Sequence, residues 1–336
     1  MPSPTLSRSL LALALLPVIG QAEVLGIPKE DGFSGFVFAG AAYNNVDSNI
    51  LVGPSKNDSR RIGSLSDMAS SDGTDLSLNF DLRYTFADAR TQIYLGNLIQ
   101  DAMRLDFSQQ LGVRHEFGDQ GIGSLAYVFS GIPTKVWQDP YRTGSDRSTT
   151  DRTSRGVRLG WDGIAGSAFD ASYTYRKIEL DDERSGQSIS SLSPAERASL
   201  NRNGSSQAVD LAYNWLLSPG RVLRPSLTYS VKDADGDAMD YSRLTGQLSY
   251  SVRTPQYSLI SNLFAGTLRY DEANPVFDRK ADATEYGLNV NFIWHRLAGI
   301  DKLNGTLMAT YGKSDADVHF FDSELSQLSA GVLYNF

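Results

Sequence analysis

The chain of 336 residues contains no cysteine. This absence excludes a disulfide framework and any C-x-x-C metal or redox site, so the stability of the fold must come from packing and backbone pairing. No apolar run reaches the roughly 20 residues that a membrane-spanning helix requires, which excludes a helical membrane protein. The formal net charge is -8. An acidic chain is a poor partner for nucleic acid, because affinity for phosphates depends on Lys and Arg.

One shorter apolar block lies near the N-terminus. Arg8 precedes the run SLLALALLPVIG, and Gly20 and Ala22 then supply the small-x-small pattern of a signal-peptidase site. A charged, an apolar and a small-residue segment in this order predict a cleaved secretory signal over residues 1–22 rather than a buried N-terminal helix. The mature chain, 23–336, is then an exported protein.

The stretch DLSLNFDLRYTF, Asp75 to Phe86, alternates strictly. Every second residue from Leu76 onward is apolar, and the residues between are polar or charged. A β-strand with two unlike faces explains this period of two. A soluble sheet with one face on a core and the other in water would show the same pattern, so one strand alone does not decide the fold.

Fourteen segments with this character follow one another from Gly32 to Phe336. They are approximately 32–45, 74–86, 90–99, 103–117, 122–132, 153–161, 168–180, 205–217, 222–232, 240–252, 257–270, 282–297, 303–313 and 321–336. The connections between them alternate between short ones rich in turn residues and longer ones, of which the longest are 46–73, 133–152, 181–204 and 271–281. Short turns at one end and long loops at the other are typical of outer-membrane barrels. The predicted fold is therefore all-β: a transmembrane antiparallel up-and-down barrel of 14 strands, with 12 or 16 as alternatives.

Aromatic residues stand at the predicted strand ends. The strands that run toward the periplasm end with Phe86, Phe117, Trp161, Trp215, Tyr250, Trp294 and Phe336. Most strands that run outward end with Tyr43, Phe129, Tyr175, Tyr229, Tyr270 and Tyr311. Amphipathic rings settle at membrane–water interfaces, so two such girdles indicate lipid-facing strands.

Two stretches carry a family resemblance: GIPKEDGFSGFVFAGAAY at 26–43 and LRYTFADARTQIYLGN at 82–97. Together with the terminal strand, they resemble an uncharacterised family of proteobacterial outer-membrane proteins, classed only as a domain of unknown function. The resemblance implies a barrel in the cell outer membrane, in contact with lipid and lipopolysaccharide. It also implies that the barrel assembly machinery reads the terminal Phe336. It assigns no substrate and no catalytic residue.

Charged residues in the polar phase predict the lining of the lumen. Six are acidic and six basic: Asp75, Asp81, Arg83, Asp106, Arg114, Glu116, Arg158, Asp170, Arg176, Arg224, Arg243 and Glu285. A balanced set argues against strong anion or cation selectivity, which follows the sign of the ring charges. Two interpretations stay open. The charges either orient a solute in a polar conduit, or they pair with one another inside a plugged barrel.

The long loops hold candidate constrictions. In 181–204, Ser193 followed by Pro194 and Glu196 forms a capping box and predicts one short helix, either a lid or a solvated loop helix. In 133–152, Trp137 and Tyr141 either stack on a ligand or pack on their own loop. The acidic segment from 233 to 240 departs from the EF-hand pattern, so a charged hairpin tip is favoured over a surface divalent ion.

The predicted function is a channel or facilitator for passive passage of a small polar or amphipathic solute. No cofactor, metal or catalytic residue is predicted, and the protein is predicted not to be an enzyme. The first alternative is a structural or surface-interaction barrel without an open pore. The second is a hydrolase at the outer rim, where His319 lies near Asp317, Asp322 and Glu324 and could serve as a general base.

Overall fold

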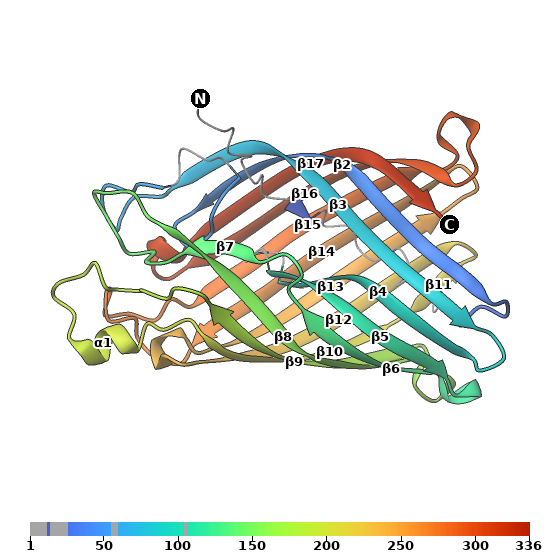
Figure 1. The fold of residues 1–336 in the computed structure, drawn as a ribbon, viewed down its shortest axis with the longest axis horizontal. Helices are drawn as coiled ribbons and strands as arrows, with labels where there is room; N and C mark the ends of the chain where they lie inside the picture. Colours follow the sequence, from blue (N-terminus) through green and yellow to red (C-terminus); the bar gives the residue numbers. More distant parts are fainter. Residues whose placement is uncertain (1–11, 14–25, 55–59, 102, 104–105) are drawn as a thin grey trace, which may run out of the picture.

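The protein is described by a computed structural model, which covers residues 12–13, 26–54, 60–101, 103 and 106–336. Fourteen long antiparallel strands form the wall of a barrel (Figure 1). They are β2 (Gly32–Ser48), β3 (Ser70–Phe86), β4 (Thr91–Asp101), β5 (Asp106–Glu116), β6 (Ile122–Phe129), β8 (Thr149–Asp162), β9 (Phe169–Leu180), β10 (Gly204–Tyr213), β12 (Arg221–Ala234), β13 (Tyr241–Arg253), β14 (Tyr257–Tyr270), β15 (Ala283–Trp294), β16 (Leu303–Ala316) and β17 (Ser323–Asn335). Each pairs with the next, and β17 pairs with β2 to close the ring. The prediction of a 14-stranded barrel is confirmed.

Short elements complete the fold. Strand β7 (Thr134–Trp137) lies in the β6–β8 loop and pairs with β8, and β11 (Trp215–Ser218) continues β10 beyond Asn214. Strand β1 (Ala12–Leu13) pairs in parallel with β3. The one α-helix of the described residues, α1 (Pro194–Ala198), has the predicted capping box. Single-turn 3-10 helices are η2 (Gly118–Gln120), η3 (Ile164–Gly166), η4 (Asp237–Met239), η5 (Leu297–Gly299) and η6 (His319–Phe321).

The predicted signal segment, 1–22, lies outside the described residues except for Ala12 and Leu13. Within the described chain, no helix has the length and apolar character needed to cross a membrane.

The two faces of the wall differ as the alternation predicts. On β3, Leu76 is 51% exposed on the outside, whereas Ser77 and Asn79 are buried on the inside. Exposed Leu, Val and aromatic side chains recur in the outer phase around the ring, and we call them the apolar belt. Closure of the ladder satisfies the backbone groups of such a wall within a bilayer.

For strand β14, alternation in the sequence does not decide which side chains face outward. Its sequence holds two competing apolar phases, and the structure places Leu263 on the outside, 56% exposed, and Ile260 and Leu268 on the inside. Tyr270 shares the inner phase and is buried against Tyr241 and Phe321. The prediction that Tyr270 belongs to the outer girdle is therefore wrong, because the inner face of β14 is apolar near its end.

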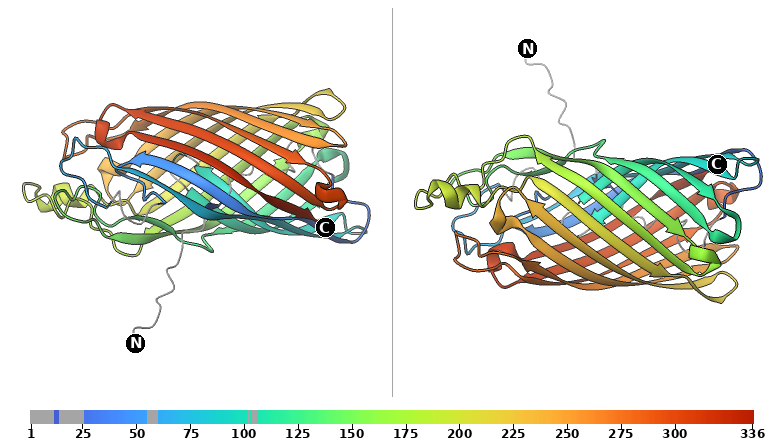
Figure 2. Two further views of the ribbon diagram at one scale, coloured as in Figure 1. Left: turned by 90° about the horizontal axis from the view of Figure 1, so that it is seen from above. Right: turned by 90° about the horizontal axis from the view of Figure 1, so that it is seen from below.

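The other aromatic strand ends lie on the outer face. At the turn end, Phe86, Phe117, Trp161, Trp215 and Trp294 are exposed, and Tyr250 and Phe336 are half-buried. At the loop end, Tyr43, Tyr175, Tyr229 and Tyr311 are exposed. Figure 2 shows α1 and the long loops at one end of the barrel, and the short turns with the C-terminus at the other.

Candidate functional site

Loops cross the mouth of the barrel at the loop end. The β6–β8 loop carries Tyr141, and the β14–β15 loop, on nearly the opposite side of the ring, carries Asn274. The Asn274 Nδ2 donates to the Tyr141 hydroxyl at 2.9 Å. The Tyr141 ring stacks on Phe320 of η6 with centroids 5.2 Å apart, and Phe277 packs beside both. Loops from nearly opposite sides of the ring therefore meet across this end.

We call this packed group the mouth cluster. Its buried members are Ile62, Ala69, Tyr141, Leu192, Leu200, Ala238, Leu268, Tyr270, Ala281, Ala283, Val318, Phe320 and Phe321. They come from six loops and the adjoining strand ends. Burial raises the pKa of Tyr141, and the hydrogen bond donated by Asn274 opposes this rise in part. Trp137 and Tyr141 are each 1% exposed. They pack among the loops and offer no ring face to a ligand.

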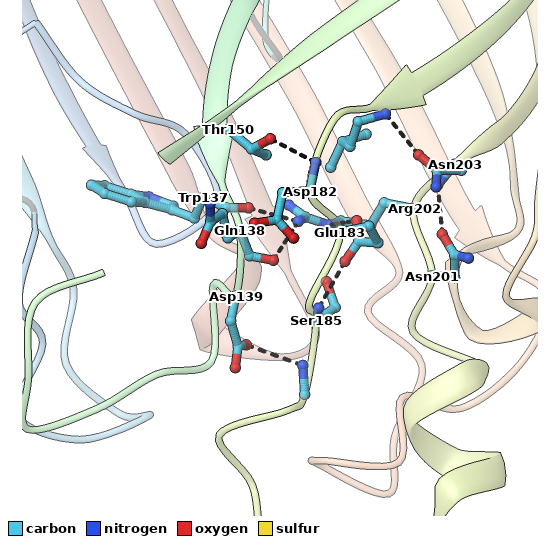
Figure 3. Close-up of polar contacts among 12 residues, drawn as sticks. Trp137, Gln138, Asp139, Thr150, Asp182, Glu183, Ser185, Asn201, Arg202 and Asn203 are labelled. Atoms are coloured by element: carbon cyan, nitrogen blue, oxygen red, sulfur yellow. Dashed lines mark hydrogen bonds and ion pairs between the residues drawn. The ribbon is translucent and has the colours of Figure 1, made fainter. Parts of the chain in front are cut away.

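Polar contacts tie the β6–β8 and β9–β10 loops together (Figure 3). Arg202 binds Glu183 at 2.8 Å and donates to the backbone carbonyls of Trp137 and Gln138 at 2.6 and 3.0 Å. Asp139 accepts from the backbone N–H groups at positions 141, 186 and 188, at 3.1, 3.0 and 2.8 Å. These bonds stabilise the packed mouth, because all but the local one from the Tyr141 N–H join segments from two loops or from the two ends of one loop.

Several of the predicted lumen arginines pair with carboxylates. The pairs are Arg83–Asp81 at 2.5 Å, Arg114–Asp162 at 3.2 Å, Arg224–Asp170 at 3.5 Å and Arg243–Glu285 at 2.7 Å. These pairs favour the interpretation in which lumen charges pair with one another over the one in which unpaired charges orient a solute. Asp162 was missed by sequence reasoning, although it falls in the inner phase of its strand.

The remaining predicted lumen residues have polar neighbours too. Asp75 accepts from Asn44 at 3.3 Å, Arg158 donates to Thr174 at 2.7 Å, and Arg176 donates to Ser154 at 3.3 Å. Glu116 pairs with Arg90 at the turn end rather than within the lumen. The side chain of Asp106 lies outside the described part of the chain.

A row of amides, which sequence reasoning also missed, runs from β3 across β4 and β5 to the end of β6. The Asn97 Nδ2 donates to Asn79 Oδ1 at 2.8 Å, and the Gln109 Nε2 donates to Asn97 Oδ1 at 3.3 Å. The Gln109 Oε1 then accepts from the Gly131 N–H at 2.6 Å. Only the register between distant segments reveals this row, since neither its spacing nor its composition stands out in the sequence.

A chamber of about 460 Å³ lies inside the barrel near the turn end. Polar and apolar side chains alternate around its lining. The apolar ones include Phe36, Ile260, Ile293 and Leu333. The polar ones include Asp81, Arg83 and Gln92, and also Ser34, Ser251, Arg253, Ser258, His295, Asn304 and Asn335. A cavity of this size with apolar walls and a few polar groups suits a small organic ligand.

The segment before β2 lies against this chamber. Gly26 and Pro28 line it, and Ile27 is 3% exposed. Arg90 holds the segment by donating to the carbonyl oxygens of Ile27 and Pro28 at 2.7 and 3.0 Å. The chamber is therefore narrowed at the turn end by a short stretch of backbone.

Histidines give no complete catalytic triad within the described residues. His295 lines the chamber with its Nε2 2.9 Å from Ser258 Oγ, but its Nδ1 faces the Pro255 carbonyl. His319 at the rim is exposed, with its Nδ1 2.7 Å from Asp322. The described part of the chain also holds no cluster of three or more His, Asp or Glu that could bind a metal.

A family model described as "Protein of unknown function (DUF2860)" matches residues 32–335. The chain belongs to this family. The match runs from the first residue of β2 to the last of β17, so the DUF2860 domain is the barrel itself. The resemblance inferred from the sequence to an uncharacterised family is confirmed. No curated protein matches the sequence.

Solved structures similar to this DUF2860 protein are outer-membrane proteins. The outer membrane channel DcaP of Acinetobacter baumannii is 12% identical, covers 91% of this chain and 97% of its own, and has a TM-score of 0.41. A Pseudomonas aeruginosa FadL homologue is 11% identical, with 90% of each chain covered and a TM-score of 0.46. An anion-selective porin from Comamonas acidovorans is 10% identical, with 91% and 100% covered and a TM-score of 0.39.

Proposed function

We propose that this DUF2860 protein is an outer-membrane channel that admits a small amphipathic solute by passive diffusion. The chamber carries the proposal, because a hollow lined by both polar and apolar side chains is matched to a solute with both characters. The apolar belt and its aromatic ends suit a bilayer. The outer-membrane location, contact with lipopolysaccharide and delivery by the barrel assembly machinery are part of the same proposal.

The lumen charges support weak ion selectivity. Arg83 forms two contacts with Asp81, at 2.5 and 3.0 Å, on the wall of the chamber. A paired guanidinium presents little net charge to a passing ion, whereas selectivity follows unpaired ring charges. We therefore propose a channel that sorts solutes by size and amphipathic shape more than by sign, and that acts without a cofactor or catalysis.

In the proposed channel, the mouth cluster is the part that must loosen before the loop end can open. Tyr141 and Asn274 join loops from opposite sides of the ring, and this contact supports a closed loop end. The same contact favours the second candidate function, a structural or surface barrel without a pore. A channel and a structural barrel differ in their conductance once the mouth cluster is loosened.

Conductance in a planar bilayer tests the choice. We compare the wild type with Tyr141→Ala, which removes the stacked ring and the Asn274 contact, and with Tyr43→Ala, which removes an exposed tyrosine of the outer face. A channel predicts conductance steps that become larger or more frequent in Tyr141→Ala and are unchanged in Tyr43→Ala. Silence in all three proteins, each shown to be folded by heat-modifiable gel mobility, would establish the structural barrel instead.

A further inference from the structure

The barrel wall is incompletely paired between β3 and its neighbour. Strand β3 pairs with β2 from Ser70 to Thr85, but it pairs with β4 only from Asp81 to Phe86. Strands β4 and β5 continue to pair with each other as far as Asp101 and Asp106, while β5 pairs with β6 only from Gln109 onward. Figure 1 shows β3 extending further toward the loop end than β4 and β5. The outer part of the β4–β5 hairpin has therefore left the wall.

The hairpin lies inside the barrel. Asn97 binds Asn79, an inner-phase residue of β3. Ile99 and Phe107 pack against a buried apolar group formed by Phe36, Phe38, Met308 and Leu333. The sulfur of Met103 lies so close to Gly312 of β16 that a Cβ there would collide with it. The outward face of the hairpin thus contacts the inward face of β2, β16 and β17.

This displacement leaves a notch in the wall, between β3 and the end of β6. Its lower edge, nearer the turn end, is the amide row, next to the pair of Asp81 with Gly96. Its upper edge is a bridge between the loops: Leu51 pairs with Val136, and Trp137 Nε1 donates to the Leu51 carbonyl at 3.1 Å. The β3 side of the notch carries Leu76 in the apolar belt, two positions below the Tyr43–Thr74 pair of the outer girdle. The notch therefore opens at the depth of the outer leaflet.

A strand edge at that depth needs partners, because backbone N–H and C=O groups are unfavourable in hydrocarbon unless they bond to protein or line a polar cavity. In the structure, Ala12 and Leu13 pair with this edge at Ser77 and Leu78. Both residues belong to the predicted signal segment. Cleavage of that segment would remove them, and the backbone groups at Ser77 and Leu78 would then need another hydrogen-bonding partner. The inner phase of the edge is polar, and Phe38 and Phe107 beside it are apolar.

We propose that this notch is a lateral portal, through which an uncharged single-chain amphiphile passes between the outer leaflet and the chamber. The inference rests on the proposed channel function and adds the route and the class of solute. The mouth cluster packs loops across the loop end, and Asp81 belongs both to the edge of the notch nearer the turn end and to the chamber wall. A hydrogen-bonding head group meets the polar edge and the amide row, while the hydrocarbon chain meets the apolar group.

Photolabelling tests the portal directly. A diazirine-bearing monoacylglycerol is incorporated into vesicles that contain the full-length protein as produced by export, and labelled residues are mapped by mass spectrometry. The portal predicts labels on Phe38 and Phe107, which both lie inside the barrel, in addition to the lipid background at Leu76. Inner-phase Thr228 and Gln247, behind a continuously paired part of the wall, stay unlabelled. Labels confined to the outer face overturn the proposal.

A blocking variant adds a second test. Ser77→Trp places a bulky side chain at the notch, and Ser226→Trp places the same side chain on the inner face of β12, where the ladder is complete. Loss of Phe38 and Phe107 labelling in the first variant alone supports the portal, and undiminished labelling in a folded Ser77→Trp protein overturns it. Conductance of polar solutes through the same proteins tests the channel function independently of the portal. If conductance steps remain while interior labelling is absent, the portal is wrong and the channel stands, whereas loss of both refutes the channel as well.

Discussion

The Arg243–Glu285 pair offers the sharpest test of how the lumen is held together. The Glu285 side chain is fully buried, Arg243 is 12% exposed, and their closest atoms are 2.7 Å apart. Ser314 donates a further hydrogen bond to Glu285 at 3.3 Å. Removing one member of a buried pair leaves a charge without its main partner, which costs about 3–5 kcal/mol. We expect Arg243→Met to lower the free energy of unfolding by that amount.

Two controls make this prediction specific. Arg155 and Glu179 are also paired across neighbouring strands but are 61% and 44% exposed, so Arg155→Met should cost no more than about 1 kcal/mol. Replacing both buried partners, as in Arg243→Met with Glu285→Leu, should restore most of the loss because no buried charge remains. The assay is guanidinium unfolding in phospholipid vesicles, followed by tryptophan fluorescence. Equal costs for Arg243→Met and Arg155→Met, or no recovery in the double variant, would refute the reasoning.

Three further predictions concern single contacts. Ser193→Ala removes the cap of α1 and should speed amide exchange in that loop, with a cost of about 1 kcal/mol. The Ser193 N–H lowers the pKa of Glu196, so its contribution is present near neutral pH and is lost as the pH falls through that lowered pKa. Arg90→Ala should free the backbone around Ile27 for proteolysis at the turn end, and unchanged protection would contradict the contact. Phe38→Ala should cost about 3–5 kcal/mol in vesicle unfolding, and a surface-like cost would show that the hairpin does not pack there.

The sequence predicts the strands well because each depends on local alternation. The residue pattern in Asp75–Phe86 needs no distant partner to show two faces, and the same holds for the other strands. Predicted segment 103–117 marks the limit. Its alternation continues into the region where β5 has left the wall, since a strand that lies inside the barrel can keep the same period as one within the wall.

The site could be predicted only in part. Inner-phase charges such as Arg243 and Glu285 follow from alternation, but their pairing depends on the register between strands. The chamber joins Phe36 to Ile260, which are far apart in the chain. The pairing of Ser258 with His295 also requires the β14–β15 register. The mouth cluster combines loops whose individual sequences resemble solvated polar segments.

The central claim is that the wall separates lipid from an interior of different polarity, residue by residue. Since the chain lacks cysteine, nitroxide labels can be placed singly at Leu227, 50% exposed, and at its neighbour Ser226 in the inner phase. Collision rates with oxygen and with a water-soluble nickel complex then report lipid and water. The account predicts high oxygen and low nickel accessibility at Leu227 and the reverse ratio at Ser226. Equal nickel accessibility at both positions, or lipid-like behaviour at Ser226, would contradict it.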